Sequence, residues 1–70
     1  MTKKMLVYAL MCETWVTPII SLRRCGLLAL SQRVGEIEAD DALMRGRKLL
    51  RKWHKTSTGA RVRAYRIVRA

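Results

Sequence analysis

Arginine is the residue type with the most evident chemistry in this 70-residue sequence. Fifteen basic residues, ten of them arginine, stand against five acidic ones, which gives a net charge of +10. The planar guanidinium group matches phosphate oxygens and the edges of guanine bases. Such an excess of positive charge predicts association with a polyanion, either a nucleic acid or an anionic membrane surface, with an acidic protein as a third option.

The charged residues are separated along the chain. Four of the five acids lie between Glu36 and Asp41, and ten of the fifteen basic residues follow Asp41 with no acid among them. We expect the acids to form a solvated helix face that offsets neighbouring arginines. The C-terminal third of the chain is therefore strongly basic.

The residue types needed for catalysis or metal binding are scarce. His54 is the only histidine, and Cys12 and Cys25 lie in separate segments, so a zinc site with four ligands is not expected. No Ser, His and Asp set is brought together by its spacing, and no glycine-rich phosphate loop occurs. We predict a cytoplasmic protein without enzyme activity or cofactor, in which both thiols are reduced, small packing residues.

A short chain of this kind has room for one domain, residues 1–70. Strong helix formers in an apolar run predict a helix over residues 3–12, and residues 14–16 suit a brief edge strand. The apolar stretch continues to Leu22 but carries Glu13 and Pro18, so a buried helix is favoured over a membrane span.

A second helix is predicted over residues 18–25. Thr17 supplies an N-cap hydroxyl, Pro18 fits the first helical position, and Gly26 can adopt the positive φ that ends a helix. Its apolar residues Ile19 and Leu22 are expected to face inward. Its two arginines are expected to face outward and to contact phosphates; they are Arg23 and Arg24.

A third helix is predicted to begin near Leu28. Leu30, Val34 and Ile37 recur with helical spacing and predict one buried face, which Leu30 starts. The opposite face holds mainly uncharged side chains, with one arginine at its border, and consists of Ser31, Gln32, Gly35, Glu36 and Arg33. Residues 42–45 either extend this helix or form a separate turn.

The last third predicts a β-hairpin with strands over residues 49–55 and 61–68. The turn between them contains Thr56, Ser57, Thr58 and Gly59, residue types that favour turns. We expect Trp53 and Tyr65 to pack against each other across the strands.

This order of elements, mainly helical with a C-terminal hairpin, predicts a winged helix-turn-helix of three helices plus a wing. In that arrangement the third helix enters the major groove of DNA and the basic wing contacts the backbone or the minor groove. The residues expected to contact DNA are Arg23, Arg24, Ser31, Gln32, Arg33, Lys55, Thr56, Ser57, Arg61 and Arg63.

Five short motifs resemble those of small phage and prophage winged helix-turn-helix DNA-binding proteins. They are WVTP at 15–18, CGL at 25–27, LSQRV at 30–34, RKWHKT at 51–56 and RVRAYR at 61–66. The resemblance departs over residues 39–48, where this chain has a longer link. It implies a small DNA-binding protein without a cofactor, acting in phage gene control or site-specific recombination.

The favoured function is therefore a sequence-preferring, double-stranded DNA-binding transcription regulator, acting as a homodimer or cooperative oligomer on DNA. Three alternatives remain at this stage. One is an excisionase-like architectural factor, the second is a module that inhibits a host protein, and the third, less favoured, is a membrane-associated basic peptide. No small-molecule substrate is expected.

Overall fold

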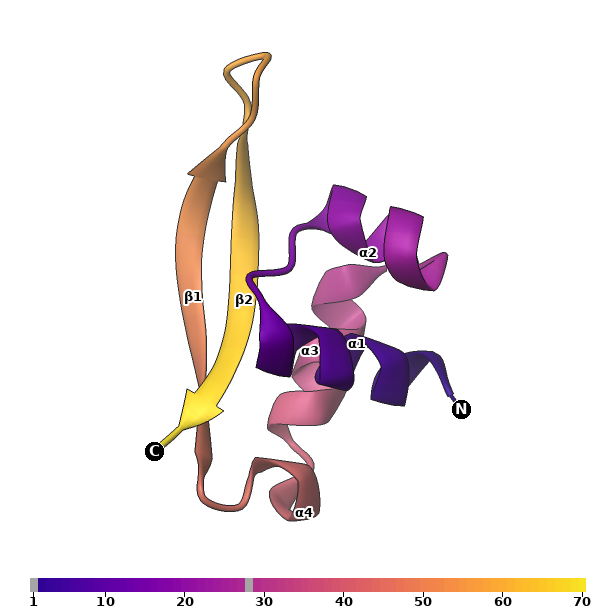
Figure 1. The fold of residues 1–70 in the computed structure, drawn as a ribbon, viewed down its shortest axis with the longest axis vertical. Helices are drawn as coiled ribbons and strands as arrows, with labels where there is room; N and C mark the ends of the chain where they lie inside the picture. Colours follow the sequence, from indigo (N-terminus) through magenta and orange to yellow (C-terminus); the bar gives the residue numbers. More distant parts are fainter. Residues whose placement is uncertain (1, 28) are drawn as a thin grey trace.

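Helices precede a C-terminal β-hairpin in the computed structural model, which describes residues 2–27 and 29–70 (Figure 1). In chain order the elements are α1 (Lys3–Glu13), α2 (Pro18–Cys25), α3 (Leu30–Glu38), α4 (Asp41–Met44), β1 (Arg47–Lys55) and β2 (Arg61–Arg69). The coarse prediction of helices followed by an antiparallel hairpin is confirmed, and the layout is compatible with a winged helix.

The predicted boundaries of α2 are confirmed by its caps. The hydroxyl of Thr17 accepts a hydrogen bond from the backbone N–H of Ile20 at 3.4 Å, and Pro18 is the first helical residue. Gly26 ends the helix with φ +65°, a left-handed conformation that costs little only for glycine. The Lys3 ammonium group also donates to the carbonyl of Cys25, so a cation stabilises the C-terminus of α2.

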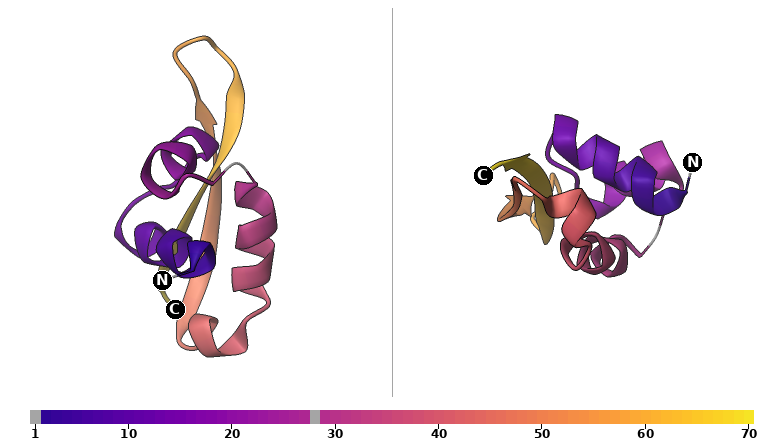
Figure 2. Two further views of the ribbon diagram at one scale, coloured as in Figure 1. Left: turned by 90° about the vertical axis from the view of Figure 1, so that its right-hand side faces the viewer. Right: turned by 90° about the horizontal axis from the view of Figure 1, so that it is seen from below.

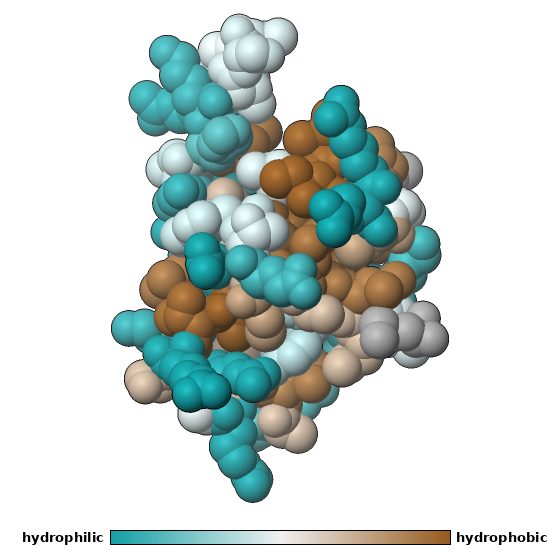
Figure 3. Space-filling view, in the orientation of Figure 1, coloured by the Kyte–Doolittle hydropathy of each residue, from teal (hydrophilic) through white to brown (hydrophobic). Residues whose placement is uncertain are grey.

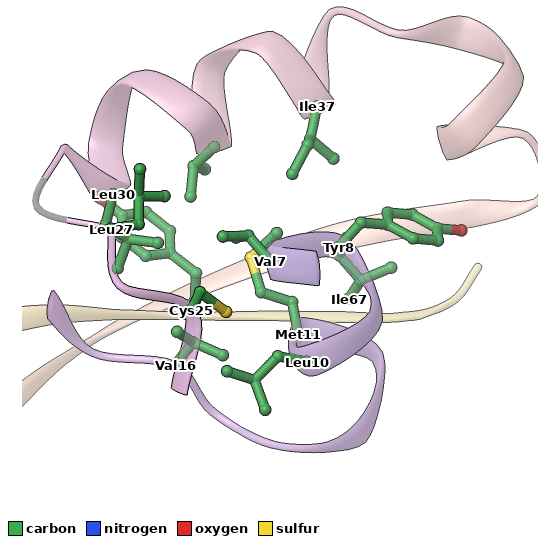
Figure 4. Packing of buried hydrophobic residues seen from close by; sticks show 12 residues of the cluster. Val7, Tyr8, Leu10, Met11, Val16, Cys25, Leu27, Leu30, Ile37 and Ile67 are labelled. Atoms are coloured by element: carbon green, nitrogen blue, oxygen red, sulfur yellow. The ribbon is translucent and has the colours of Figure 1, made fainter. Parts of the chain in front are cut away.

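α1 forms the centre of the core because it contacts α2, α3 and β2. Val7 and Met11, one helical turn apart, are fully buried. Figure 4 shows their side chains converging with Ile37 of α3 and Ile67 of β2. The predicted buried face of α3 is confirmed, with Leu30, Val34 and Ile37 all at most 2% exposed.

The prediction that Ile19 and Leu22 face inward is wrong. They are 56% and 43% exposed, whereas Ser21 and Cys25 on the neighbouring face of α2 are buried. A polar side chain can lie in this core because the Ser21 hydroxyl donates to the carbonyl of Leu27 at 3.3 Å. This hydrogen bond spans the Gly26 turn and fixes how α2 is rotated.

The link between α3 and the hairpin contains a separate helical turn, α4. The Asp40 carboxylate accepts hydrogen bonds from the backbone N–H groups of Ala42 and Leu43, so it caps α4 as a new helix. Gly46 follows with φ +70° and leads into β1. At the other end of α3, the predicted start near Leu28 lies outside the described residues, and the helix as described begins at Leu30.

The hairpin is longer than predicted at its base, because β1 begins at Arg47 and β2 ends at Arg69. The predicted edge strand over residues 14–16 is reduced to a single bridge, in which Val16 and Tyr65 exchange backbone hydrogen bonds of 2.8 and 3.0 Å. Beyond this bridge the hairpin extends past the helices (Figure 1), and its two strands stay paired as far as Lys55 and Arg61, next to the turn.

The two cysteines differ in environment. Cys25 is buried as predicted, but Cys12 is exposed, because it lies on the outer side of α1 while Val7, Tyr8 and Met11 occupy the buried side. Partial desolvation and the adjacent Glu13 raise the pKa of the Cys12 thiol. Within the described part of the chain, none of the helices combines the length and apolar composition needed to cross a membrane.

Candidate nucleic-acid interface

The net positive charge of the chain belongs entirely to the hairpin and the residues next to it. Residues 1–44 carry five basic and five acidic side chains, which cancel. Residues 45–70 carry ten basic side chains and no acid, and therefore account for the whole net charge of +10. A polyanion is expected to meet this part of the molecule first.

One face of the hairpin is buried and apolar near the base and exposed and basic near the tip. Residues directly opposite each other in an antiparallel pair point to the same face, and successive residues alternate between faces. On one face Tyr65 and Ile67 are buried against the helices near the base. Toward the tip the same face, which we call the basic face, carries the exposed residues Arg51, Trp53, Lys55, Arg61 and Arg63.

The tip of the hairpin is held by hydrogen bonds within the turn. Thr56 donates its backbone N–H to the carbonyl of Ala60 at 2.8 Å, and Gly59, at φ +89°, donates to the carbonyl of Thr56 at 2.9 Å. The hydroxyls of Thr56 and Thr58 lie 2.9 Å apart. The structure therefore brings together four residues predicted to contact DNA, namely Lys55, Thr56, Ser57 and Arg61, at the end of a projecting loop.

Trp53 does not pack across the strands as predicted. The register places Arg63 opposite Trp53 and Arg51 opposite Tyr65, so each aromatic ring faces an arginine. The Arg63 guanidinium lies over the indole of Trp53, 4.7 Å from its centroid, and Trp53 remains 60% exposed. Tyr65 instead belongs to the core, and its backbone forms the bridge with Val16.

The outer face of α3 is exposed, and its charges are largely paired. Ser31 and Gln32 are exposed, as predicted. Arg33 is half-buried and donates two hydrogen bonds from Nη1 to the Glu36 carboxylate, at 2.8 and 3.1 Å. Of these three residues predicted to contact DNA, Ser31 and Gln32 expose their side chains to solvent. The guanidinium group of Arg33 is hydrogen-bonded to the Glu36 carboxylate.

Two further acids join elements that are distant in sequence. Glu38 on α3 accepts from Arg51 on β1 at 2.7 Å, and Asp40 accepts from Lys4 on α1 at 2.9 Å. These hydrogen bonds lower the pKa of each carboxyl group, and the Glu38 carboxylate raises the pKa of Arg51. The expectation that the acids offset neighbouring basic residues is confirmed by these pairs.

An open cleft of about 680 Å³ separates α2 from the hairpin tip. Ile19 and Leu22 line one wall, and Figure 3 shows apolar side chains gathered over α2 beside this hollow. Arg23 also lines the cleft, together with Thr56 and Ser57. The structure therefore brings Arg23 near the tip, and Arg24 is exposed on the adjoining surface of α2.

In the left view of Figure 2, α2 and α3 lie to either side of the projected hairpin, whereas Figure 1 shows both helices on the same side of it. Arg23 and Arg24 belong to α2, and Ser31 and Gln32 belong to α3. The N-terminal end of α3 points toward the end of the molecule from which the tip projects. The predicted residues thus lie on two helices on one side of the hairpin and on the hairpin tip.

Sequence reasoning missed Trp53 and Arg51 as parts of the candidate interface. The signal was present in the alternation of residues, because Arg51, Trp53 and Lys55 share one parity on β1 and Arg61 and Arg63 share the matching parity on β2. Aromatic residues in a strand are more often core residues than surface residues, and this tendency hid the pattern.

No protein-family model, curated protein or solved structure matches the chain. The resemblance to small phage DNA-binding proteins therefore remains a prediction. Among residues 2–27 and 29–70, no three His, Cys, Asp or Glu side chains are grouped closely enough to hold a metal ion. The candidate interface consists of cations, amides, hydroxyls and one exposed indole.

Proposed function

We propose that this chain is a double-stranded DNA-binding protein of the winged helix-turn-helix class. In this proposal α3 lies in the major groove, and the hairpin is the wing that follows the phosphate backbone or the neighbouring minor groove. The observation that carries the proposal is the concentration of the whole net charge on a projecting hairpin beside an exposed helix.

The wing supplies affinity in this proposal. Arg61, Arg63 and Lys55 are exposed at or near the tip, and the hydroxyls of Thr56 and Ser57 add hydrogen-bonding groups for phosphate oxygens. Phosphate contacts of this kind carry no sequence information, so the wing is expected to bind all duplexes with comparable strength.

α3 supplies sequence preference. A glutamine amide can form two hydrogen bonds to an adenine edge, which makes Gln32 the first candidate for reading a base. Ser31 beside it can pair with several bases. Arg33 must exchange its hydrogen bonds with Glu36 for contacts to DNA, and this exchange reduces its net contribution.

We infer that the biological role is that of a transcription regulator of the small phage type. A footprint over one palindromic site would support this role, whereas an extended, cooperative footprint with bending would support an architectural role in recombination. Binding to an acidic protein, without measurable duplex binding at low salt, would favour the host-inhibitor alternative.

Selection of bound duplexes from a random pool at two salt concentrations tests the proposal. With roughly six phosphate contacts, the logarithm of the affinity should fall with the logarithm of the salt concentration with a slope near −5. The selected sequences should share a motif, and a symmetric motif would indicate a dimer. Absence of duplex binding at low salt, or binding that salt does not weaken, contradicts the proposal.

A further inference from the structure

We propose that Trp53 and Arg63 form a stacking site for a nucleobase that has left the duplex stack. The inference rests on the proposed DNA-binding function. It adds an unstacked nucleobase as a ligand, which binding to a regular duplex does not require. It predicts that the chain distinguishes a continuous duplex from one in which a base is unpaired or kinked out.

An indole ring that is 60% exposed is unusual on a surface made of basic side chains. The core does not use it, because Trp53 lies closer to the tip than Tyr65 and Ile67, the residues of this face that are buried. In the strand register its nearest neighbours on the basic face are Arg51, Lys55 and Arg63, all cations. Among the described residues, Trp53 is therefore outside the buried cluster that the other core aromatics join.

The other aromatic residues that face cations provide a direct contrast. Tyr8 under Arg47 and Tyr65 under Arg51 are 9% and 8% exposed and belong to the core. Trp15 is half-buried, with the Lys52 ammonium 4.3 Å from its ring centroid. Among these cation–aromatic pairs of the described residues, the ring of Trp53 is the one that stays largely open to solvent.

The pair is organised for a nucleotide. The Arg63 guanidinium covers part of the indole at 4.7 Å and is aligned by the strand register. The remaining exposed surface of the indole can stack on a base, because every base has an aromatic face and such stacking tolerates any sequence. Arg63, already held beside the ring, can pair with a phosphate of the same strand.

The ligand must be a base outside the regular stack. Inside a continuous duplex both faces of each base are covered by its neighbours, so an indole gains access only at a bulge, a kink or a strand end. The chemical class of the ligand is therefore an unstacked nucleobase with its adjacent phosphate, presented by DNA that also contacts the basic face.

Tryptophan fluorescence tests this inference. The variant Trp15→Phe leaves Trp53 as the single tryptophan, which is excited at a wavelength that tyrosine does not absorb. This variant is titrated at low salt with a short perfect duplex and with the same duplex carrying one unpaired thymidine. We expect the bulged duplex to quench Trp53 emission more strongly and to bind about tenfold more tightly. Trp53→Ala should abolish this preference, so that the two duplexes bind with about equal affinity. Trp53→Phe should restore part of the preference.

Each result has a defined meaning. If both duplexes bind with the expected salt dependence but Trp53→Ala keeps the tenfold preference, or if emission does not change, the stacking site is refuted and the proposed function stands. If neither duplex binds, both are refuted. Circular dichroism of Trp53→Ala is expected to match that of the parent, because an exposed ring contributes little to the core.

Discussion

The helical part of the chain, residues 2–44, and the hairpin part, residues 45–70, divide two tasks between them. The helical part supplies most of the core and has no net charge, whereas the hairpin part holds all of the net charge of the molecule. The two parts meet at the base of the hairpin, where Tyr65 and Ile67 join the core. Toward the tip, residues 51–55 of β1 and Arg61 and Arg63 of β2 are exposed.

This division implies that stability and the proposed DNA binding can be changed separately. Substitution of a buried apolar residue in α1 or α3 alters the free energy of unfolding without removing a cation. Substitution of an exposed basic residue near the tip removes a cation without opening a cavity.

Met11→Ala should produce the largest change. Met11 is fully buried where α1 meets the rest of the core, so its truncation is expected to lower the free energy of unfolding by about 2–5 kcal/mol. The total for a chain of this size is about 4–10 kcal/mol. Urea denaturation followed by circular dichroism measures the change. Leu6→Ala, at a 37% exposed position of the same helix, is the control and should cost much less.

The double variant Arg61→Ala/Arg63→Ala should have the next largest effect, and it acts on binding. Loss of two phosphate contacts is expected to weaken duplex binding about 50-fold near 0.1 M salt, for all sequences alike, and to reduce the salt slope by about 2. The free energy of unfolding should change by less than about 0.5 kcal/mol per site. Fluorescence anisotropy with two unrelated duplexes measures the affinity.

The control for this variant removes the same charge far from the tip. Arg45→Ala/Arg69→Ala changes two exposed arginines at the opposite end of the hairpin. An equal loss in both double variants would show that total charge, rather than the tip, determines binding. Unchanged affinity of the tip variant would show that the hairpin is not the wing.

Gln32→Ala should alter the preference among DNA sequences rather than the affinity for duplex DNA in general. Loss of an amide that reads a base is expected to reduce discrimination at one base pair about tenfold while leaving binding to unrelated duplexes unchanged. Lys55→Gln is the matched contrast, because it should weaken binding to all sequences equally. Competition between selected and scrambled duplexes distinguishes them, and an unchanged preference in Gln32→Ala would remove α3 from sequence reading.

Glu38→Gln should have the smallest effect, because it breaks an exposed ion pair with Arg51 that joins the two parts. The pair lowers the pKa of Glu38, so its stabilisation is present above the unfolded-state value of about 4.3 and is lost as the pH falls through the lower folded value. At neutral pH we expect a loss of about 0.2–1 kcal/mol.

Urea denaturation at several pH values measures this difference. The stabilities of Glu38→Gln and the parent should converge in acid, where the carboxyl group is protonated. A double-mutant cycle with Arg51→Gln isolates the coupling between the two side chains. Coupling that is absent at neutral pH would show that the pair does not hold α3 to the hairpin.

Local signals in the sequence predicted the elements well. Thr17, Pro18 and Gly26 define α2 because capping and left-handed backbone depend on neighbouring residues alone. The spacing of Leu30 and Val34 identified the buried side of α3 for the same reason. The hairpin followed from two β-prone runs around a turn-forming segment.

Features that depend on tertiary contacts were not predictable in this way. The rotation of α2 follows from a hydrogen bond between Ser21 and Leu27, which no periodicity reveals because Ile19, Ile20 and Leu22 supply apolar residues to several faces. The candidate interface shows the same limit. The sequence identified exposed cations. Which of them form hydrogen bonds to a neighbouring acid, as Arg33 does to Glu36, depends on side-chain geometry.

The outer edge of β1 has a consequence for how the molecule behaves at high concentration. The sheet has two strands, and in the described part of the chain the other edge of β1 has no strand partner. Five of the nine β1 residues are basic, so mutual repulsion opposes pairing of two such edges and protects against aggregation. Added salt screens that repulsion. We therefore expect the protein to self-associate in concentrated solution as the ionic strength rises.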